Sequence, residues 1–385
     1  MLYATHARIH LDAIRHNLSG IRTAVGDAQV LMAVKANAYG HGAVEVARDV
    51  EAAGLVDRFG VATVPEGIEL REAGVRLPIL KLSHAFAEET DAALAHDLEL
   101  AVVNESGIDE VAAAAEARGV TARVHLKLDT GMGRIGAPIE AAADLAARIE
   151  ASPLLHLLGV FTHFPASDAP AQDEFTHGQI DRLTSAAQAI EARIGRGVEL
   201  VHMANSGGVL GHPEARGTMV RPGIMTYGYY PDATTPRTID LRPAITWATR
   251  VSFLKRVKAG ETVGYGRTWT APADTWIATM PVGYADGYDR HLSNAGTVLV
   301  GGRRYPVVGR VCMDQAMFDA GPTPSVNVGD EVVLLGTSGQ ESYTADDMAA
   351  RLGTISYEIT CAIAPRVTRV YTGRFGDDEG VDAGH

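Results

Sequence analysis

The feature that most constrains the fold is a regular alternation of short apolar runs and alanine-rich stretches in the first part of the chain. The apolar runs are nearly continuous, which is typical of parallel strands buried on both faces. The stretches between them, such as Ile108–Arg118 and Ile139–Ala151, mix alanine with Glu and Arg and favour helices. Eight strand runs follow one another: Val30–Lys35, Phe59–Thr63, Pro78–Ser83, Leu98–Val103, Arg123–Asp129, Leu157–Phe164, Glu199–Ser206 and Thr218–Gly228.

Eight β-then-α units predict an N-terminal (β/α)8 TIM barrel, a fold of about 250 residues. A doubly wound open sheet is the alternative, because sequence alone does not establish that the sheet closes. At 385 residues the chain is too long for one ordinary core, so we expect two domains.

The pattern changes after about residue 235, near Pro236 and Pro243, where the long helical stretches end. Short strand candidates separated by Gly, Pro and Asp take their place and predict a mostly antiparallel β domain. These candidates are Ile245–Val257, Glu261–Tyr265, Thr275–Tyr284, Gly296–Val300, Tyr305–Met313 and Asp330–Leu335. We therefore expect a barrel over residues 1–235 and a β domain over residues 236–385, with the first ten or so residues of the chain packing with the β domain.

Two local signals complete this second region. Thr344-Ala-Asp-Asp347 has the form of a capping box that opens a short helix. The tail Asp377–His385 is acidic and rich in glycine, which predicts disorder.

Composition and charge exclude several classes of function. A formal net charge of -13 argues against nucleic acid or an anionic membrane as a partner, because both require a basic surface. A small anionic ligand stays compatible, since local cations and backbone amides can bind it. The two cysteines, Cys312 and Cys361, give no disulfide framework and favour a reducing compartment. With no apolar run of membrane-spanning length and no signal-peptide core, we expect a cytoplasmic protein.

The run Val30–Lys35 ends in a lysine, and a glycine-flanked tyrosine, Tyr39, follows directly. A lysine at the buried end of a strand is costly to keep charged, so its amine is driven toward the neutral form. A neutral amine is a nucleophile toward aldehydes and also a base. The alternative is that Lys35 simply emerges into solvent.

Polar residues recur at the carboxyl ends of the predicted barrel strands, which meet at one mouth where barrel active sites lie. The residues concerned are Lys35, Lys127, Asp129, His163, Asn205, Ser206 and Arg221. A structural protein has little reason to repeat this pattern. The polar residues at the strand ends therefore indicate an enzyme.

Ordered motifs in both regions resemble those of alanine racemases, the pyridoxal-phosphate enzymes of the barrel fold type. Ala33-Val-Lys-Ala-Asn-Ala-Tyr-Gly-His-Gly42 is similar to the family's cofactor-lysine signature. The resemblance continues through His125–Arg134, Phe161–Phe164, His202–Ser206, Val220–Gly223, Val263–Gly266, Pro281–Tyr288, Gly309–Gln315 and Thr354–Glu358. Any one motif is weak, but the ordered set is specific. One departure is Pro165, where we expect alanine.

The resemblance implies a two-base racemisation of L- and D-alanine. Lys35 matches the lysine that carries pyridoxal 5'-phosphate and acts as one base, and Tyr265 matches the second base. A free tyrosine titrates near pH ~10, so Tyr265 needs help to act at neutral pH. In the family that help is a relay through a histidine to an arginine, and His163 and Arg221 match those positions. Arg221 also matches the arginine that faces the cofactor's ring nitrogen; it keeps its own proton, so that nitrogen stays unprotonated.

Further residues match binding positions of the family. The phosphate contacts correspond to Tyr39, Ser206, Gly223, Ile224 and Tyr357, with Asn205 beside them; Asn205 and Ser206 have a helix N-cap as their alternative reading. Arg134 matches a residue that contacts cofactor and substrate, and Met313 and Tyr284 match substrate-side positions. Lys127 matches a lysine that is carbamylated in the family. No metal is implied.

The resemblance also implies a homodimer in which Tyr265 and Met313 complete the active site of the other subunit. Alternatives within enzymes are a serine racemase or one of broader specificity, and an amino-acid decarboxylase of the same fold type. The decarboxylase signature pairs Cys with Asp, whereas Cys312 is followed by methionine. A non-enzymatic alternative is a pyridoxal-phosphate carrier, but such carriers are single barrels and leave residues 236–385 without a purpose.

Overall fold

The computed structural model describes residues 2–376, and the contacts within it define two compact units. The barrel unit comprises Ile14–Ala38 and Gly42–Arg242. The β unit comprises the described residues before Ile14, the short segment Tyr39–His41 and the described residues from Pro243 onward. The predicted tail Asp377–His385 lies outside the described residues.

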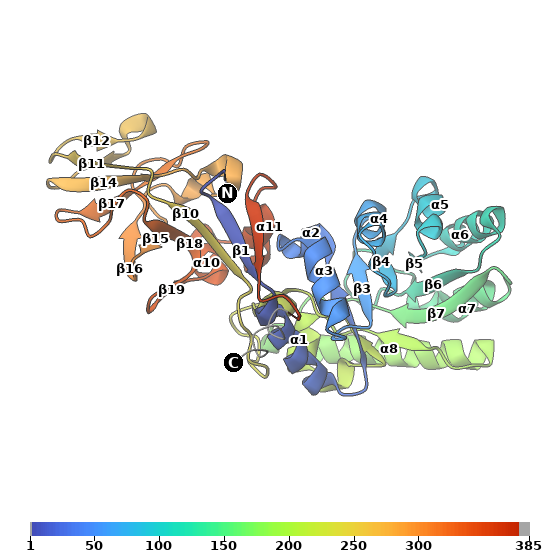
Figure 1. Ribbon diagram of the computed structural model, residues 1–385. Coiled ribbons are helices and arrows are strands. Elements are labelled where there is room, and N and C mark those ends of the chain that lie inside the picture. Colours follow the sequence, from blue (N-terminus) through green and yellow to red (C-terminus); the bar gives the residue numbers. More distant parts are fainter. Residues whose placement is uncertain (1, 377–385) are drawn as a thin grey trace, which may run out of the picture. The chain divides into compact units, whose positions relative to one another are not determined.

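Eight parallel strands close into a barrel, in sequence order from β2 to β9 (Figure 1). They are β2 (Gln29–Ala33), β3 (Arg58–Val61), β4 (Ile79–His84), β5 (Leu98–Val102), β6 (Ala122–Lys127), β7 (Leu155–Phe161), β8 (Leu200–His202) and β9 (Met219–Val220). Closure comes from the pairing of β2 with β9, where Gln29 lies opposite Met219. The predicted fold class is confirmed, and the open-sheet alternative is wrong.

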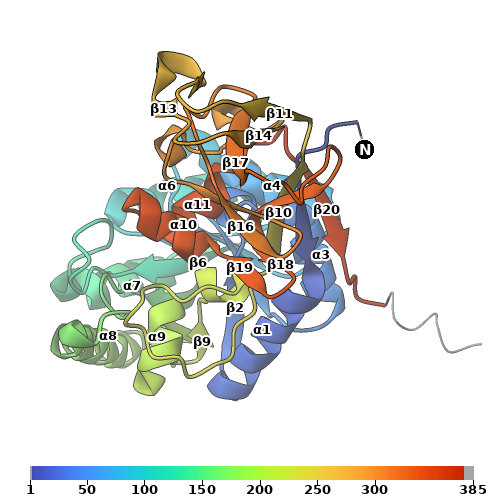
Figure 2. The same ribbon diagram turned by 90° about the vertical axis from the view of Figure 1, so that its left-hand side faces the viewer.

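Helices lie around these strands, one before β2 and the others after successive strands (Figure 1). They are α1 (Leu11–Val25), α2 (Lys35–Tyr39), α3 (Ala43–Ala52), α4 (Val64–Glu72), α5 (Ala87–Ala95), α6 (Glu105–Arg118), α7 (Ala142–Glu150), α8 (Asp173–Ile194) and α9 (Ser206–Gly211). The predicted helix at Ile108–Arg118 begins three residues earlier, because Asn104 caps α6 by accepting a hydrogen bond from the Gly107 amide. Helices α7 and α8 pack against each other (Figure 2).

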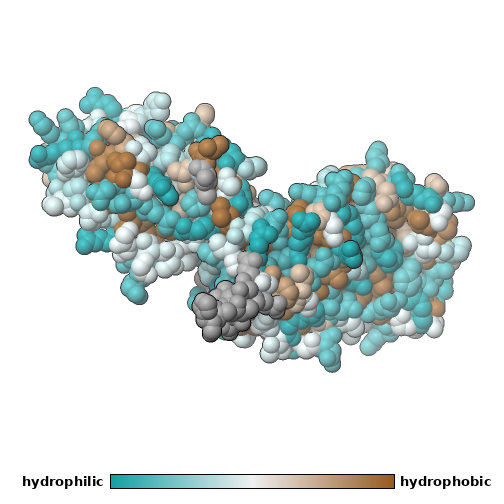
Figure 3. Space-filling model, in the orientation of Figure 1, coloured by the Kyte–Doolittle hydropathy of each residue, from teal (hydrophilic) through white to brown (hydrophobic). Residues whose placement is uncertain are grey.

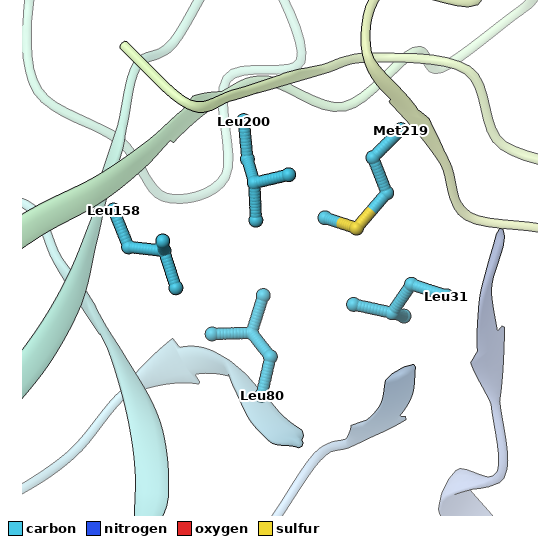
Figure 4. Packing of buried hydrophobic residues seen from close by; sticks show 5 residues of the cluster. All are labelled: Leu31, Leu80, Leu158, Leu200 and Met219. Atoms are coloured by element: carbon cyan, nitrogen blue, oxygen red, sulfur yellow. The ribbon is translucent and has the colours of Figure 1, made fainter. Parts of the chain in front are cut away.

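The barrel interior is filled by side chains rather than by solvent. One cluster comes from five different strands: Leu31, Leu80, Leu158, Leu200 and Met219, each at most 5% exposed (Figure 4). Branched and flexible apolar side chains that point inward from several strands fill the space between them, as expected for a barrel core. This packing holds the strand ends in fixed positions.

The β unit contains three sheets. The largest has the order β16-β15-β18-β10-β1-β20, with β19 paired to β18; the others are β11-β14-β17 and β12-β13. The strands are β1 (His6–His10), β10 (Ile245–Arg250), β11 (Phe253–Val257), β12 (Thr262–Val263), β13 (Trp269–Thr270), β14 (Thr275–Met280), β15 (Thr297–Val300), β16 (Arg303–Pro306), β17 (Ala316–Gly321), β18 (Glu331–Ser338), β19 (Glu341–Tyr343) and β20 (Thr368–Thr372). Most neighbours are antiparallel, and β1 pairs in parallel with β20.

Two strand predictions in the β unit need correction. The run Ile245–Val257 is two strands in two different sheets, because the chain bends at Val251 and Ser252 and their amides bond to Asp330 and Thr279. The run Tyr305–Met313 leaves its strand after Pro306, and β17 lies further on, at Ala316–Gly321.

Two helices belong to the β unit, α10 (Ala345–Leu352) and α11 (Ser356–Ala362), and they lie next to each other (Figure 2). The predicted capping box is confirmed, since Thr344 accepts from the Asp347 amide while the Asp347 carboxylate accepts from the Thr344 amide.

Hydrophilic side chains cover most of the visible surface of both units, with apolar ones in small groups (Figure 3). Within residues 2–376, no helix combines the length and apolar character required to cross a lipid bilayer.

Candidate active site

Lys35 lies at the start of an unusual turn rather than at the end of a strand. Strand β2 ends at Ala33, and Lys35 is partly exposed, so the prediction that it occupies a buried strand end is wrong. Ala36, Asn37 and Ala38 all have φ between 52° and 54°, which makes one turn of left-handed helix. That conformation costs roughly 1–2 kcal/mol for each residue with a Cβ. The chain thus turns abruptly just after the lysine, which fixes its backbone at the mouth of the barrel.

Side-chain hydrogen bonds hold this turn. The Glu66 carboxylate, at the start of α4, accepts from the Ala36 amide at 2.7 Å and from the Ala62 amide at 2.8 Å. The Asn37 side-chain oxygen accepts from the Ala43 amide at 2.8 Å. Asn tolerates left-handed backbone better than most residues, but the alanines do not. These contacts therefore supply the stabilisation that the sequence Lys-Ala-Asn-Ala lacks.

Four cationic side chains gather around His163 in the barrel unit. The charges of Arg221, Arg134, Lys127 and Lys35, together with burial, lower the pKa of the His163 imidazole well below its usual range. His163 is therefore neutral at physiological pH.

Lys127 belongs to the same cluster. Burial and the charges of Arg221, Arg134 and Lys35 lower the pKa of the Lys127 amine to about 8. The Asp129 carboxylate opposes this shift but accepts hydrogen bonds from the Gly131 and Gly133 amides. The mouth of the barrel is therefore strongly positive, although the whole chain is acidic.

Arg221 is the most deeply held of these cations. It is 5% exposed, and burial lowers its pKa to about 9, which leaves it charged at neutral pH. Its Nη2 donates to the Thr162 carbonyl at 2.6 Å and lies 3.4 Å from His163 Nδ1, and its Nη1 lies 3.0 Å from His202 Nδ1. Among residues 2–376, the Arg221 Nε–H has no hydrogen-bond acceptor, so it is available to a ligand.

A buried relay extends from Arg221 through the barrel interior. His202 Nε2 lies 3.0 Å from His125 Nδ1, and His125 Nε2 lies 3.2 Å from a Glu99 oxygen. These three side chains are fully buried. Because a guanidinium only donates, His202 Nδ1 must accept; His202 then donates from Nε2 to His125 Nδ1, and His125 donates from Nε2 to Glu99.

The pKa shifts agree with this arrangement. Burial, and for His202 the charge of Arg221, lower the pKa of both imidazoles, so both are neutral. Burial alone would raise the pKa of Glu99, but the His125 hydrogen bond and the Arg58 and Arg123 guanidinium groups outweigh it and keep the carboxylate ionised. Sequence reasoning missed Glu99, His125 and His202 as site residues. The available signal was a charged or polar residue inside an otherwise apolar strand, as in Leu98-Glu-Leu-Ala-Val102.

Asn205 and Ser206 lie where strand β8 leads into α9. Asn205 caps α9, since its side-chain oxygen accepts from the Gly208 amide and from the Ser167 hydroxyl. This arrangement favours the helix-cap reading for Asn205. The Ser206 hydroxyl oxygen accepts from the Gly223 amide at 2.9 Å and from the Met225 amide at 3.4 Å. With its oxygen so occupied, Ser206 presents its O–H proton as a donor.

The remaining predicted site residues belong to the β unit. Tyr39 and Tyr357 have ring centroids 5.9 Å apart, and burial raises the pKa of the Tyr39 phenol. Tyr265, Tyr284 and Met313 are exposed, Tyr265 by 74%. These three line one hollow of about 600 Å³ together with Cys312, Arg290 and Arg310. A second hollow of about 420 Å³ shares Tyr265 and Cys312. No role was predicted for either arginine, although Arg310 lies within the Gly309–Gln315 motif.

The backbone around Met313 depends on a close approach that only glycine permits. A Cβ on Gly283 would lie 2.2 Å from the Cys312 carbonyl oxygen and 2.3 Å from that of Met313. The buried Asp286 carboxylate braces this segment, because it accepts from the Gly283 amide at 2.9 Å and from Arg366 at 2.7 Å. Tyr284 and Met313 are thereby held beside the same hollow.

Comparisons with known proteins agree with this architecture. The model of the alanine racemase N-terminal domain matches residues 9–231, and that of the alanine racemase C-terminal domain matches residues 244–371. The alanine racemase of Cutibacterium acnes is 52% identical over 370 residues, which cover 96% of this chain and 98% of the relative. The alanine racemase of Chlorobaculum tepidum is 44% identical over 95% of each chain.

A solved structure of alanine racemase from Clostridium difficile 630 superposes with a TM-score of 0.90 at 36% identity, and the match covers 96% of each chain. The two domain models, the sequence relatives and the solved structure all indicate the same family. The chain belongs to the alanine racemase family, with the barrel and the C-terminal domain of that family both present.

Proposed function

We propose that this chain interconverts L- and D-alanine with pyridoxal 5'-phosphate bound at the barrel mouth, by a two-base mechanism shared between two subunits. The observation that carries the proposal is the cluster of Lys35, Lys127, Arg134 and Arg221 around a neutral His163. Such a cluster suits a ligand that brings negative charge in a phosphate and a carboxylate.

The donors of the barrel unit fit this cofactor. Lys35 supplies the amine that would carry it, and the Ser206 O–H, fixed by the Gly223 and Met225 amides, suits a phosphate oxygen. Ile224 lies between Gly223 and Met225 in the chain, so its backbone is a further candidate for the phosphate, as are Tyr39 and Tyr357 of the β unit. The Arg221 guanidinium suits the ring nitrogen. When bound, the cofactor would withdraw electrons from the α-carbon of alanine and so make its proton removable.

Arg221 and its relay set how strong that withdrawal is. Arg221 keeps its protons, and its Nη1–H donates to His202 at one end of a chain of neutral imidazoles that ends on the Glu99 carboxylate. The buried anion offsets the buried cation at the other end of the relay. Arg221 would therefore donate to the ring nitrogen without transferring a proton to it, which favours simple racemisation over side reactions.

The two bases must reach opposite faces of the α-carbon. Lys35 would remove or return the proton on one face, and the phenolic oxygen of the partner subunit's Tyr265 on the other. His163 Nδ1 faces the Arg221 donor at 3.4 Å, so its proton belongs on Nε2. A neutral His163 with an Nε2–H can donate to the ionised phenol and stabilise Tyr265 in its base form.

Arg134 and the backbone amide of the partner subunit's Met313 would orient the substrate carboxylate. Lys127 is the candidate for carbamylation: with a pKa of about 8, a fraction of its amine is neutral at physiological pH and can react with carbon dioxide. Carbamylated Lys127 would be an anion near Arg134 and Arg221. The modification would therefore replace repulsion between cations by attraction.

A homodimer accounts for the exposed groups of the β unit. Tyr265, Tyr284 and Met313 are large side chains that line one hollow and remain exposed. Exposed apolar groups around a hollow indicate an interaction surface. The partner subunit's Tyr265 would then face the barrel mouth of the other subunit, and the site would be complete only in the dimer.

The experiment is to reduce the protein as purified with borohydride, digest it and locate the cofactor, alongside an assay for D-alanine formation from L-alanine. We expect a yellow protein, modification at Lys35 and racemase activity. Lys81, a buried lysine of the barrel unit, is the internal control and should stay unmodified. A colourless protein that takes up no pyridoxal phosphate would exclude the proposal. The same assay with serine tests the broader-specificity alternative.

A further inference from the structure

Two histidines and a glutamate converge on the barrel unit at a place that the racemisation does not use. His177 lies in the first turns of α8, and His212 and Glu214 lie at the short 3-10 turn that follows α9. Their ligand-type atoms all lie within 4.8 Å of one another. His177 Nε2 is 2.9 Å from Glu214 Oε1, and His212 Nδ1 is 3.6 Å from the same oxygen.

These separations suit a tetrahedral zinc site. With metal–nitrogen and metal–oxygen distances near 2.0–2.1 Å, neighbouring ligand atoms lie about 3.3–3.5 Å apart. The two nitrogen–oxygen distances in the structure, 2.9 Å and 3.6 Å, lie on either side of this range. Two imidazoles on one tetrahedral ion would have ring centroids about 5.2 Å apart. The rings of His177 and His212 have centroids 5.4 Å apart and planes inclined by 82°. An ordinary ion pair needs one histidine, whereas here two approach a single carboxylate oxygen.

The other nitrogen of His212 also has a partner typical of metal sites. His212 Nε2 lies 3.6 Å from an Asp173 oxygen at the start of α8, just beyond hydrogen-bond distance, and the half-exposed Asp173 side chain has room to close that gap. Histidine ligands usually donate their second N–H to a carboxylate, which orients the ring and makes it a better ligand. His212 is 2% exposed, so this ring is held in place before any ion arrives.

The three candidate ligands differ in burial, so one is fixed in place and two can move. The side chains of His177 and Glu214 are 54% and 47% exposed, against the nearly buried His212. The exposed pair can move inward to close the ligand distances, and a water molecule can take the fourth position. Two histidines, one glutamate and water form a donor set that zinc accepts.

We propose that His177, His212 and Glu214 bind one zinc-type divalent cation, oriented by Asp173. The ion would link the start of α8 to the segment that follows α9. Helix α9 itself begins at Ser206. Its role is structural and does not depend on the proposed function. Binding would raise the thermal midpoint of the barrel unit and leave racemisation unchanged.

The test uses the untagged full-length protein as purified, treated with a chelator and then titrated with Zn²⁺ by calorimetry and with Co²⁺ by visible absorption. We expect one ion per chain and the intense absorption bands of tetrahedral Co²⁺. Asp173→Asn should weaken Zn²⁺ affinity by about 10–100-fold, and His177→Gln should weaken it more. His177 is half-exposed, so this variant should fold, which circular dichroism and retained racemase activity would verify.

The matched control is His156→Gln. His156 Nε2 also lies 2.9 Å from a glutamate oxygen, that of Glu199, with similar exposure but no second histidine in the contact. Zn²⁺ affinity should stay within about twofold in this variant if the ion is at the proposed site. Absence of binding, unchanged affinity in His177→Gln, or an equal loss in His156→Gln would overturn the proposal.

Discussion

The barrel unit and the β unit present their candidate site residues in opposite ways. In the barrel unit, Arg221 and the relay behind it are buried and hydrogen-bonded, so donors and acceptors are fixed before any ligand arrives. In the β unit, Tyr265 and Met313 are more than half exposed beside open hollows. The groups of the barrel unit are therefore positioned by the fold of a single chain. Tyr265 and Met313 would be covered only when another subunit packs against them.

This contrast explains how one protein can combine fixed, buried charges around Arg221 with a base, Tyr265, that comes from another subunit. Buried polar groups are costly unless all are paired, and the relay from Arg221 to Glu99 meets that demand. An exposed phenol has no such constraint, and its acidity changes when charged groups approach it. The following experiments test the contrast from its largest expected effect to its smallest.

The largest effect belongs to the exposed base. Tyr265→Phe should lower the racemisation rate by about 10²–10⁴-fold, because it removes a proton-transfer group and little else. Exchange of the α-hydrogen with deuterated water should persist for one enantiomer of alanine, through Lys35, and be lost for the other. Nuclear magnetic resonance can follow both. If both enantiomers exchange at wild-type rates, Tyr265 is not the second base.

The next effect tests the buried relay. Glu99→Gln removes the anion that faces Arg58 at 2.5 Å and His125 at 3.2 Å. We expect the free energy of unfolding to fall by about 3–5 kcal/mol, since the fully buried His125 loses its charged acceptor and the largely covered Arg58 keeps only Gln29 as a side-chain partner. Glu331→Gln in the β unit is the matched control: its pair with Arg8 has a similar distance, 2.6 Å, but is partly exposed. That change should cost about 0–1 kcal/mol. Equal losses in urea titrations would show that burial does not distinguish the two pairs.

A smaller effect concerns Lys127 and pH. Its pKa is about 8 in the folded chain and near 10.5 in the unfolded chain. Between these values the unfolded chain binds more protons, so stability should rise with pH across this window, by on the order of 3 kcal/mol. Lys127→Met should flatten the rise, measured by urea unfolding in buffer free of carbon dioxide. Lys258→Met, at an exposed lysine of the β unit, should keep it. A rise of equal size in the Lys127 variant would contradict the assignment.

The smallest effect compares two helix caps, one in each unit. Thr63 and Thr344 both accept from the amide three residues on, in capping boxes with Glu66 and Asp347. Replacing either threonine by alanine should cost about 1 kcal/mol, because one helix donor loses its partner. In the barrel unit Glu66 also supports the left-handed turn after Lys35. Thr63→Ala should therefore lower racemase activity as well, whereas Thr344→Ala should not.

The sequence predicted the fold better than it predicted local geometry. All eight barrel strands were predicted, because continuous apolar runs mark strands buried on both faces. Their predicted ends often extend too far, as at Lys35, since apolar character continues into loops that pack on the core. The left-handed turn was not predictable, because alanine has no preference for it and Glu66, distant in sequence, stabilises it. In the β unit, β17 was missed because its short run is interrupted by Asp319.

The candidate site followed a similar division. Motifs indicated the residues at the barrel mouth, and the structure gathers several of them around His163. The buried relay was not predicted because a polar residue inside an apolar strand indicates a buried polar group but does not identify its partners. Arg290 and Arg310 were not predicted as site residues, because separate loops form the hollow that they line.

The most direct test of the shared two-base site is complementation between two inactive variants. Lys35→Ala and Tyr265→Phe chains are unfolded together and refolded as a mixture. Half of the dimers should contain one chain of each kind, and each of these should have one of its two sites intact. We predict recovery of about a quarter of wild-type activity, whereas each variant refolded alone should keep about a hundredth of it or less. A mixture as inactive as its components, although mixed dimers form, would contradict a site built from Lys35 of one subunit and Tyr265 of the other.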